Sequence, residues 1–424
     1  MNGGLLERLA KRSNDVSLGR LKARLRENLT RHAPTLLEQA RSDSRARARL
    51  KAYIADFLMR EGIMLDSDRR SAMIDALHAE LVGMGPLEEL LADPEVQEVM
   101  VNGPSTVYVE KSGRLELTEV RFESEEALWE VLLRMVEAAG RRIDRSSPYV
   151  DARLPGGARL NAIVPPLSVK GPAITIRKFS RHFRSLEDLV RAGCVEARVA
   201  DFLRSCVLQR ANMLITGPAS SGKTTLLNVL CALIPPGAER VITIEDAAEL
   251  DLPYPHVVAL EARPANVEGR GQITIRQLVI NALRMRPDRL IVGECRGAEA
   301  FDMVQAMLTG HEGSMSTIHA SSPYDALIRL ESMVLMAGEG VPHKVIRQQI
   351  ASAIDVIVHL RREADGTRKV SEVAVVLPPS PAGELALWTL FPWTEGRVPG
   401  PGEVPDWNSI KARLKEERRE AEVL

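Results

Sequence analysis

The sequence is poor in the residues that mark several classes of protein. Only four of its 424 residues are cysteine, and these lie 12, 25 and 64 residues apart without a CxxC pair. That spacing excludes a disulfide-stapled module and a zinc site built on paired cysteines. We expect reduced and mostly buried thiols at Cys194, Cys206, Cys231 and Cys295.

Charge of one sign and long apolar runs are also scarce. Lys and Arg total 56 against 57 Asp and Glu, so no global field draws the whole chain onto nucleic acid or anionic lipid. No apolar run reaches 18 residues, and the charged first thirty residues contain no apolar core of a signal peptide. We therefore expect a cytoplasmic protein that is neither secreted through a cleaved signal nor inserted in a membrane.

The remaining composition is that of a folded protein of two or three domains, with 45% hydrophobic and 27% charged residues. Hydrophobic periodicity and turn signals divide it into four segments. They are a helical arm (1–75), a mixed α/β domain (76–180), a second α/β domain with a parallel sheet (181–378) and a tail (379–424). The tail contains Trp388, Trp393 and Trp407 and is expected to be peripheral, with a charged helix over 407–421.

The predicted arm is basic. From Arg8 to Lys51 it contains 13 Lys and Arg residues, against five acids within residues 1–55. This pattern is typical of a solvated helix surface, and it would equally suit docking to an acidic partner or a membrane surface. The sequence leaves both interpretations open.

The strongest chemical signal is the octapeptide Gly217–Thr224, GPASSGKT, which matches GxxxxGK[ST]. It follows a short apolar segment that predicts a strand and precedes a predicted helix. In such a loop, backbone N–H groups and the helix N-terminus bind phosphate oxygens, the lysine neutralises β/γ charge and the last hydroxyl can ligate Mg²⁺. We therefore predict an ATP site with Mg²⁺ at Gly217, Ser220, Ser221, Gly222, Lys223, Thr224 and Thr225.

Acidic residues follow two further predicted strands. Glu294 ends the apolar run Leu290–Gly293, and Glu245, Asp246 and Glu249 follow the run that begins at Val241. Ligands of open parallel sheets gather at the strand carboxyl ends, so both groups should lie near the phosphate loop. Glu294 could polarise the attacking water or hold a metal-bound water, and two acidic clusters favour hydrolysis over passive binding. Of the residues named so far, Thr224 and Glu294 are the predicted metal ligands.

Two histidines, His311 and His319, lie eight residues apart in a segment with glycines on its N-terminal side. Zinc is improbable, because no further ligand has matching spacing. Their residue type and spacing suit a structural hydrogen-bonding role, and also a role in sensing bound nucleotide.

Together these segments resemble the type II/IV secretion ATPase superfamily, and most closely its CpaF-like branch, which powers tight-adherence (Flp) pilus assembly. The resemblance covers about Leu81 to Val376 and rests on the order and spacing of several motifs. They are MGPLEELLADPEVQEVMVNGPSTVYVEKSGRL, VDARLPGGARLNAIVPP, ITIRKF, GPASSGKTT, ITIEDAAEL, RPDRLIVGECRG and TGHEGSMSTIHASSP.

The resemblance implies an N-terminal α/β domain hinged to a RecA-like motor domain, assembled as a homo-hexamer that binds ATP between the domains. It also implies an inner-membrane platform protein as partner. ITIEDAAEL is similar to the family's aspartate box, which implies Glu245 and Asp246 as further metal ligands and places Glu249 near metal and water. LIVGE is similar to the family's Walker B strand. Glu294 and Glu249 are then rival candidates for positioning the attacking water. The segment from His311 to His319 is similar to the histidine box, which favours nucleotide sensing.

In the family, arginines of the N-terminal domain reach nucleotide phosphates, and Arg159 and Arg177 occupy the matching positions. An arginine that binds ATP better than ADP would let hydrolysis shift a closed–open equilibrium between the domains. Two other functions stay possible on the residues alone, a RecA-like nucleic-acid translocase and a nucleotide switch. The neutral charge balance and an aromatic content of 4% disfavour the first, and the two acidic clusters disfavour the second.

Overall fold

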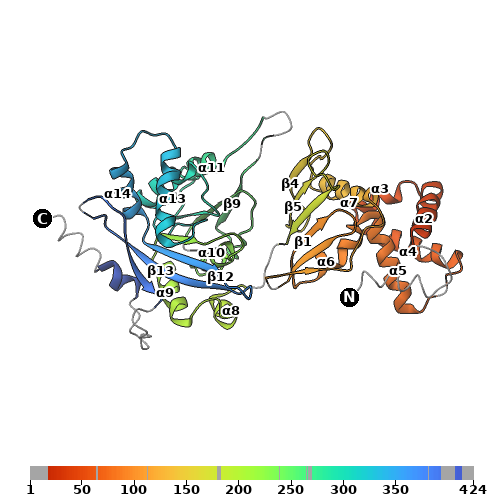
Figure 1. Cartoon of the computed structure of the whole chain (residues 1–424), viewed down its shortest axis with the longest axis horizontal. Helices are drawn as coiled ribbons and strands as arrows, with labels where there is room; N and C mark the ends of the chain where they lie inside the picture. Colours follow the sequence, from red (N-terminus) through yellow and green to blue (C-terminus); the bar gives the residue numbers. More distant parts are fainter. Residues whose placement is uncertain are drawn as a thin grey trace. The chain divides into compact units, whose positions relative to one another are not determined.

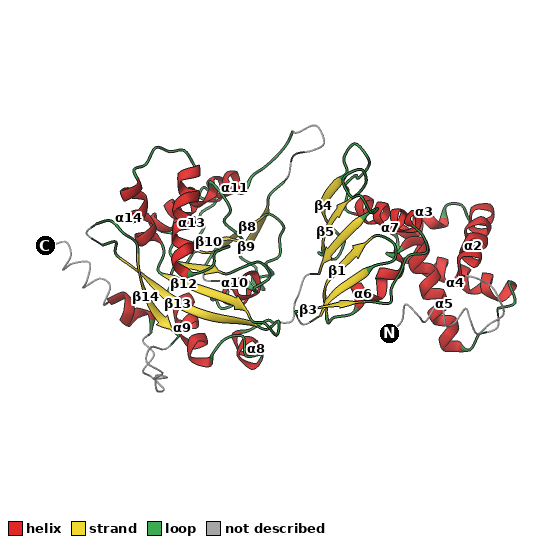
Figure 2. Cartoon of the chain, in the orientation of Figure 1, coloured by secondary structure: helices red, strands yellow, loops and turns green. Residues whose placement is uncertain are grey.

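The computed structural model describes residues 18–63, 65–111, 113–178, 183–237, 239–263, 265, 270–380, 382–392 and 406–412 (Figures 1 and 2). Contacts between residues divide the chain into two compact units, Met1–Phe179 and Ser180–Leu424, and each is presented below by itself. Among the described helices, none is both long enough and apolar enough to cross a membrane.

The first unit begins with a bundle of helices. Asp43 and Asp66 accept hydrogen bonds from backbone N–H groups at the starts of the two longest, which satisfies donors that a helix leaves unpaired. Leucines on all but the shortest helix, among them Leu25, Leu50 and Leu77, are fully buried in one shared core. The described part of the predicted arm is therefore a packed bundle and not an isolated appendage. Its helices are α2 (Leu18–His32), α3 (Leu36–Ser42), α4 (Ser44–Arg60) and α5 (Ser67–Val82).

Several cations of the basic segment pair with acids of the same unit. Lys22 Nζ lies 2.7 Å from Glu80 Oε2, and Arg26 forms two hydrogen bonds with Glu130. Lys51 Nζ lies 2.6 Å from Asp75 Oδ1. The local excess of positive charge seen in the sequence is therefore partly compensated by acids that lie later in the chain.

A six-stranded antiparallel sheet completes the first unit, in the order β3-β2-β1-β6-β5-β4. Inward residues such as Val99, Leu160 and Ile176 pack against Leu128 and Leu132 of α7 in one core. Two strands, β3 and β4, were not predicted, because β3 is exposed along its length and β4 is buried mainly at Val150. The elements are η1 (Gly85–Leu87), α6 (Glu88–Ala92), β1 (Val96–Asn102), β2 (Val107–Lys111), β3 (Arg114–Leu117), α7 (Glu125–Ala138), β4 (Tyr149–Arg153), β5 (Arg159–Ile163) and β6 (Ala173–Arg177).

The second unit is built on an eight-stranded sheet in the order β14-β13-β12-β7-β11-β10-β8-β9. In this order, the six neighbouring strands β12, β7, β11, β10, β8 and β9 run parallel. Strands β13 and β14 are antiparallel additions at the β12 edge. Four of the strands, β7, β8, β10 and β11, are buried at every residue, as expected of a sheet covered on both faces. The strands are β7 (Met213–Thr216), β8 (Val241–Glu245), β9 (Val257–Glu261), β10 (Arg289–Val292), β11 (Met315–Ile318), β12 (Val356–Arg362), β13 (Arg368–Leu377) and β14 (Ala386–Phe391).

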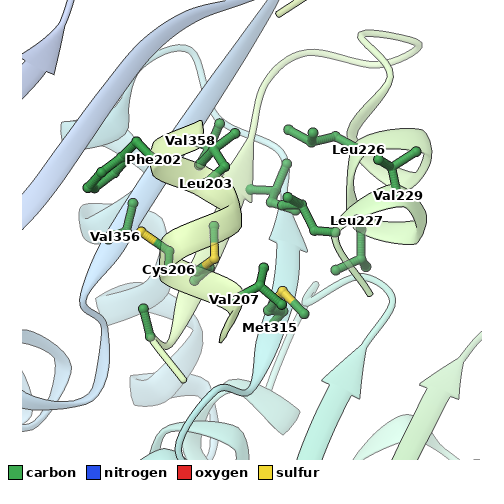
Figure 3. Packing of buried hydrophobic residues seen from close by; sticks show 14 of the residues in the cluster. Phe202, Leu203, Cys206, Val207, Leu226, Leu227, Val229, Met315, Val356 and Val358 are labelled. Carbon is green, nitrogen blue, oxygen red and sulfur yellow. The ribbon is translucent and has the colours of Figure 1, made fainter. Parts of the chain in front are cut away.

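Helices cover both faces of this sheet and enclose two cores. On one face, α9 and α10 pack Phe202, Leu203 and Leu227 against strand residues that include Val356 and Val358 (Figure 3). On the other face, α11 to α14 pack against Leu214, Ile318 and Ile357. The helices are α8 (Leu186–Arg191), α9 (Ala197–Leu208), α10 (Lys223–Cys231), α11 (Ile275–Ala282), α12 (Glu299–Leu308), α13 (Pro323–Met336) and α14 (His343–Ala353).

The described part of the C-terminal segment belongs to this unit, so the expectation of a peripheral tail is wrong for these residues. Trp388 lies on β14 and pairs with Val375 of β13. Trp407 is fully buried in the core that α9 and α10 share. Residues 407–412 are helical, while Trp393 and the rest of the predicted charged helix lie outside the described residues.

Candidate nucleotide site

The phosphate loop connects the buried strand β7 to α10, as the motif predicts. Its backbone has positive φ at Gly217 (+151°), Ser220 (+56°) and Gly222 (+94°), which curls the chain between strand and helix. A Cβ atom on Gly217 would lie 2.5 Å from the backbone oxygen of Leu360 and 2.7 Å from Ser221 Oγ. Only glycine fits at Gly217, because the neighbouring strand β12 approaches it so closely.

Lys223 is the first residue of α10 and is almost completely buried. Its ammonium donates to the carbonyl oxygens of Gly217 (3.1 Å) and Pro218 (2.8 Å), and it lies 3.2 Å from Nδ1 of His319. The lysine charge is therefore held over its own loop, within reach of any anion that the loop binds.

His319 joins the lysine to the acid of the neighbouring strand. Its Nε2 lies 2.8 Å from Oε1 of Glu294, while Oε2 of Glu294 accepts a 2.8 Å hydrogen bond from Arg296. Arg296 also lies 3.4 Å from Asp246, which follows β8. Lysine, histidine, glutamate, arginine and aspartate from four segments thus form one chain of contacts at the carboxyl ends of the strands.

The electrostatics of this chain keep Glu294 ionised and His319 neutral. Burial raises the pKa of Glu294, but the hydrogen bond from Arg296 and the nearby positive charges lower it by more, so that it lies below its ordinary value. Burial and the ammonium of Lys223 lower the pKa of His319, and the charge of Glu294 opposes them only in part. A carboxylate in this state can accept a proton or orient a water molecule.

Glu245 has different surroundings from Glu294. Glu245 is 4% exposed, and its carboxylate accepts hydrogen bonds from the backbone N–H groups of Glu249 (3.0 Å) and Leu250 (3.2 Å). Burial raises the pKa of Glu245 to about 7, against the effect of these two hydrogen bonds. The contacts give Glu245 a part in holding the loop after β8, and its assignment as a metal ligand stays a prediction.

The two predicted histidines are separated by strand β11. His311 precedes the strand, and its Nδ1 lies 3.1 Å from the backbone oxygen of Ala306 near the end of α12. His319 follows the strand at the edge where the phosphate loop lies. Because β11 spans four residues, or about 13 Å, His319 lies beside the phosphate loop of this unit and His311 lies at the other end of the strand. A nucleotide contact of His311 stays a prediction.

Arg159 and Arg177 face each other on adjacent strands β5 and β6 of the first unit. Their Cα atoms are register partners, and Arg177 is also the partner of Glu98 on β1. Burial raises the pKa of Glu98, and the positive charge of Arg177 counteracts this only in part. The phosphate loop belongs to the second unit, so contact of either arginine with nucleotide stays a prediction.

The loop is chemically suited to a polyphosphate and Mg²⁺. The ammonium of Lys223 supplies positive charge. The buried hydroxyl oxygens of Thr216 and Ser221 have no hydrogen-bond partner, so polar atoms at the loop remain to be satisfied by a ligand. Among the described residues, no three His, Cys, Asp or Glu side chains converge as a metal site. A Mg²⁺ ion here would rely on phosphate oxygens, the Thr224 hydroxyl and one or two acids, as is usual for this ion.

Sequence reasoning missed one histidine beside the loop. His359 lies on β12 as the register partner of Thr216, is 7% exposed and has an unpartnered Nδ1. Burial, Arg361 and Lys223 lower its pKa, whereas Asp325 raises it. A single histidine within an apolar run gives no signal in the sequence, and only the strand order places it next to β7.

Comparison with known proteins agrees with this geometry. The profile of the family "Type II/IV secretion system protein" matches residues 80–382. The chain is 38% identical over 319 residues to a protein of Mycobacterium tuberculosis whose name proposes a part in conjugal transfer, covering 74% of this chain and 90% of that one. It is 34% identical over 321 residues to the type IV secretion system protein VirB11 of Brucella suis, covering 68% and 88%.

The solved structure of the DotB ATPase from Yersinia pseudotuberculosis has the same fold, with a TM-score of 0.51 at 16% identity over 68% of this chain and 77% of that one. The second unit is accordingly a RecA-like ATPase domain, preceded by an N-terminal α/β domain. The matched profile covers most of the chain and includes the phosphate loop, Glu294 and His319. The chain therefore belongs to the type II/IV secretion system protein family, and it is a P-loop ATPase.

Proposed function

We propose that this chain is a hexameric motor that hydrolyses Mg-ATP to power Flp/Tad-type pilus assembly or type II/IV secretion at the cytoplasmic face of the inner membrane. The observation that carries the proposal is the contact chain from Lys223 through His319 to Glu294. It links the group that holds phosphate charge to the group that can activate water.

Each residue has a distinct task in this proposal. Lys223 and the loop N–H groups bind the β- and γ-phosphates, and Thr224 with the acids of β8 and β10 holds Mg²⁺. The bound Mg-ATP supplies the phosphoryl group whose hydrolysis releases the energy. Glu294 is ionised and orients the attacking water, and His319 links its carboxylate to Lys223.

We further propose that Arg159 and Arg177 close the N-terminal domain onto ATP. Closure follows if these arginines bind ATP better than ADP, since only differential affinity can shift a conformational equilibrium. Small-angle scattering of the wild type with ADP and with a non-hydrolysable ATP analogue should then differ, and Arg177→Ala should reduce that difference. An unchanged difference in the variant would count against the hinge.

The motifs ITIEDAAEL, RPDRLIVGECRG and TGHEGSMSTIHASSP support the CpaF-like assignment, and the relatives named for conjugal transfer and type IV secretion support a part in a secretion machine. The proposed partners are five further copies of this chain and a platform protein of the inner membrane. Membrane association is then peripheral and passes through that partner. Direct contact with nucleic acid is not part of the proposal.

The test is the steady-state ATPase rate of the purified chain at several protein concentrations, with and without single- and double-stranded DNA. A rate per chain that rises steeply with concentration and ignores DNA is expected if active sites are completed between subunits. Strong stimulation by DNA would instead favour a nucleic-acid translocase. Lys223→Ala serves as the control for contaminating ATPases.

A further inference from the structure

The turn between β12 and β13 carries two pairs of like charges placed directly across the strands. Arg361 is the register partner of Lys369, and Arg362 is the register partner of Arg368. Like charges opposite each other destabilise an antiparallel pair. Glu363 compensates part of the charge by accepting a hydrogen bond from Arg361 at 2.8 Å.

This hairpin lies directly against the phosphate loop. Besides the contact of Leu360 with Gly217, a Cβ atom on Gly222 would lie 3.5 Å from Cδ of Arg368 and 3.9 Å from Cδ2 of Leu360. Gly222 immediately precedes α10, so the side chain of Arg368 borders the N-terminus of the helix at which the loop binds phosphate.

The four cations divide between the two faces of the hairpin. Val358 and Leu360 belong to the core that α9 and α10 enclose, and Val358 is visible beside α9 in Figure 3. Because side chains alternate along a strand, Arg362 lies on the same face as Leu360, and its cross-strand partner Arg368 shares it. Arg361 and Lys369 therefore lie on the opposite face, away from α10.

The strand order indicates which end of a bound nucleotide lies near Arg362 and Arg368. β7 has β11 and then β10 on one side, and β12 with β13 on the other. His319 and Glu294 follow β11 and β10, so the γ-phosphate end belongs on that side of the loop. The nucleoside end of a bound nucleotide must then extend toward the β12–β13 side, where Arg362 and Arg368 lie.

We propose that Arg362 and Arg368 form a nucleoside-side wall of the ATP site, in which they contact the α-phosphate, ribose or base of the nucleotide. A guanidinium suits this position because it donates several hydrogen bonds to phosphate or ribose oxygens and can stack its plane on a base. The inference rests on the proposed ATP site and extends it by two residues. These residues bind ATP and ADP alike, since neither meets the γ-phosphate.

The test measures dissociation constants of the full-length chain for fluorescently labelled ADP, with unlabelled ADP and a non-hydrolysable ATP analogue as competitors. Arg368→Ala should weaken both nucleotides by the same factor, about tenfold for the loss of a charge-assisted hydrogen bond. Lys369→Ala is the matched control, since it removes a neighbouring charge from the opposite face, and it should change affinity less than twofold. Arg368→Lys should give an intermediate loss.

Two results would overturn the inference. One is an Arg368→Ala variant that binds like Lys369→Ala, and the other is a loss confined to the ATP analogue, which would place Arg368 near the γ-phosphate. Arg362→Ala tests the same wall from β12 if Arg368→Ala does not fold. Failure of the wild type to bind labelled ADP would refute the ATP site itself, so the two failures are distinguishable.

Discussion

The ammonium of Lys223 lies 3.2 Å from Nδ1 of His319. Because an ammonium can only donate, Nδ1 must be the acceptor, and the proton of the neutral ring is then on Nε2. Nε2 lies 2.8 Å from Oε1 of Glu294, but this oxygen has no hydrogen-bond partner, so the pair is a close contact and not an aligned hydrogen bond. Lys223 therefore defines the tautomer of His319, and movement of Lys223 toward a phosphate would remove the contact at Nδ1.

Lys223→Ala should reduce the ATPase rate by roughly 10²-fold or more, because the variant lacks the charge that meets the β- and γ-phosphates. The measurement is phosphate release at saturating Mg-ATP, with circular dichroism to show that the fold is kept. Hydrolysis near the wild-type rate would refute the assignment of the site.

Glu294→Gln should lower the turnover rate by roughly 10²–10⁴-fold, the usual contribution of a general base, while ATP still binds. Glu249→Gln is the control that decides between the two candidate acids. The Glu294 carboxylate contacts His319, which in turn contacts Lys223 of the phosphate loop, whereas the backbone N–H of Glu249 donates to Glu245 on the neighbouring strand. The larger loss is therefore expected at Glu294, and a larger loss at Glu249 would reverse the assignment.

The sequence predicted those parts of the site that depend on local chemistry. The GPASSGKT motif located the loop, and apolar runs followed by Glu294 and Glu245 located the strand ends, because a buried parallel strand leaves a strong local pattern. The strands β3, β4, β9, β11 and β14 were not predicted. Most residues of β3 and β4 are exposed, those of β9 and β14 are exposed or only half-buried, and the buried β11 contains the polar residues Ser316 and Thr317.

Features that depend on strand order could not be predicted. His359 meets Thr216, and Arg368 meets Gly222, only because β12 pairs with β7 although more than 130 residues separate them. Conversely, a spacing of eight positions suggested that His311 and His319 act together, but the four-residue strand β11 between them takes them to opposite ends of that strand. Spacing along the chain indicates proximity only when the intervening conformation is known.

Glu245→Gln should remove a pH-dependent loss of stability. Burial raises the folded pKa of Glu245 to about 7, above its ordinary value, so the folded state retains a proton that the unfolded state releases. The contribution of this group is greatest below about pH 4.5 and is lost as the pH rises through 7. Glutamine keeps an acceptor for the N–H groups of Glu249 and Leu250 without ionising.

The measurement is the free energy of urea unfolding at pH 5 and pH 8 for wild type and Glu245→Gln. From pH 5 to pH 8, the free energy of unfolding of the wild type should fall by about 2 kcal/mol more than that of the variant, since one pKa unit corresponds to about 1.4 kcal/mol. Glu384→Gln, at an exposed position between β13 and β14 on the far side of the sheet, should not show this difference from the wild type. An equal pH dependence of the Glu245 variant and the wild type would show that Glu245 ionises normally.

Trp407→Ala should destabilise the second unit even though Trp407 lies far beyond the last predicted strand. The indole is fully buried among residues of α9 and the sheet, and the backbone N–H of Trp407 donates a 2.9 Å hydrogen bond to Ser205 Oγ. Removing a buried tryptophan leaves a cavity and costs about 3–5 kcal/mol. The indole Nε1 has no partner, so its removal offsets part of this loss, and we expect about 3 kcal/mol in urea unfolding. The exposed neighbour Asn408→Ala should have little effect, and equal stabilities of the two variants would show that the C-terminal segment does not contribute to the core.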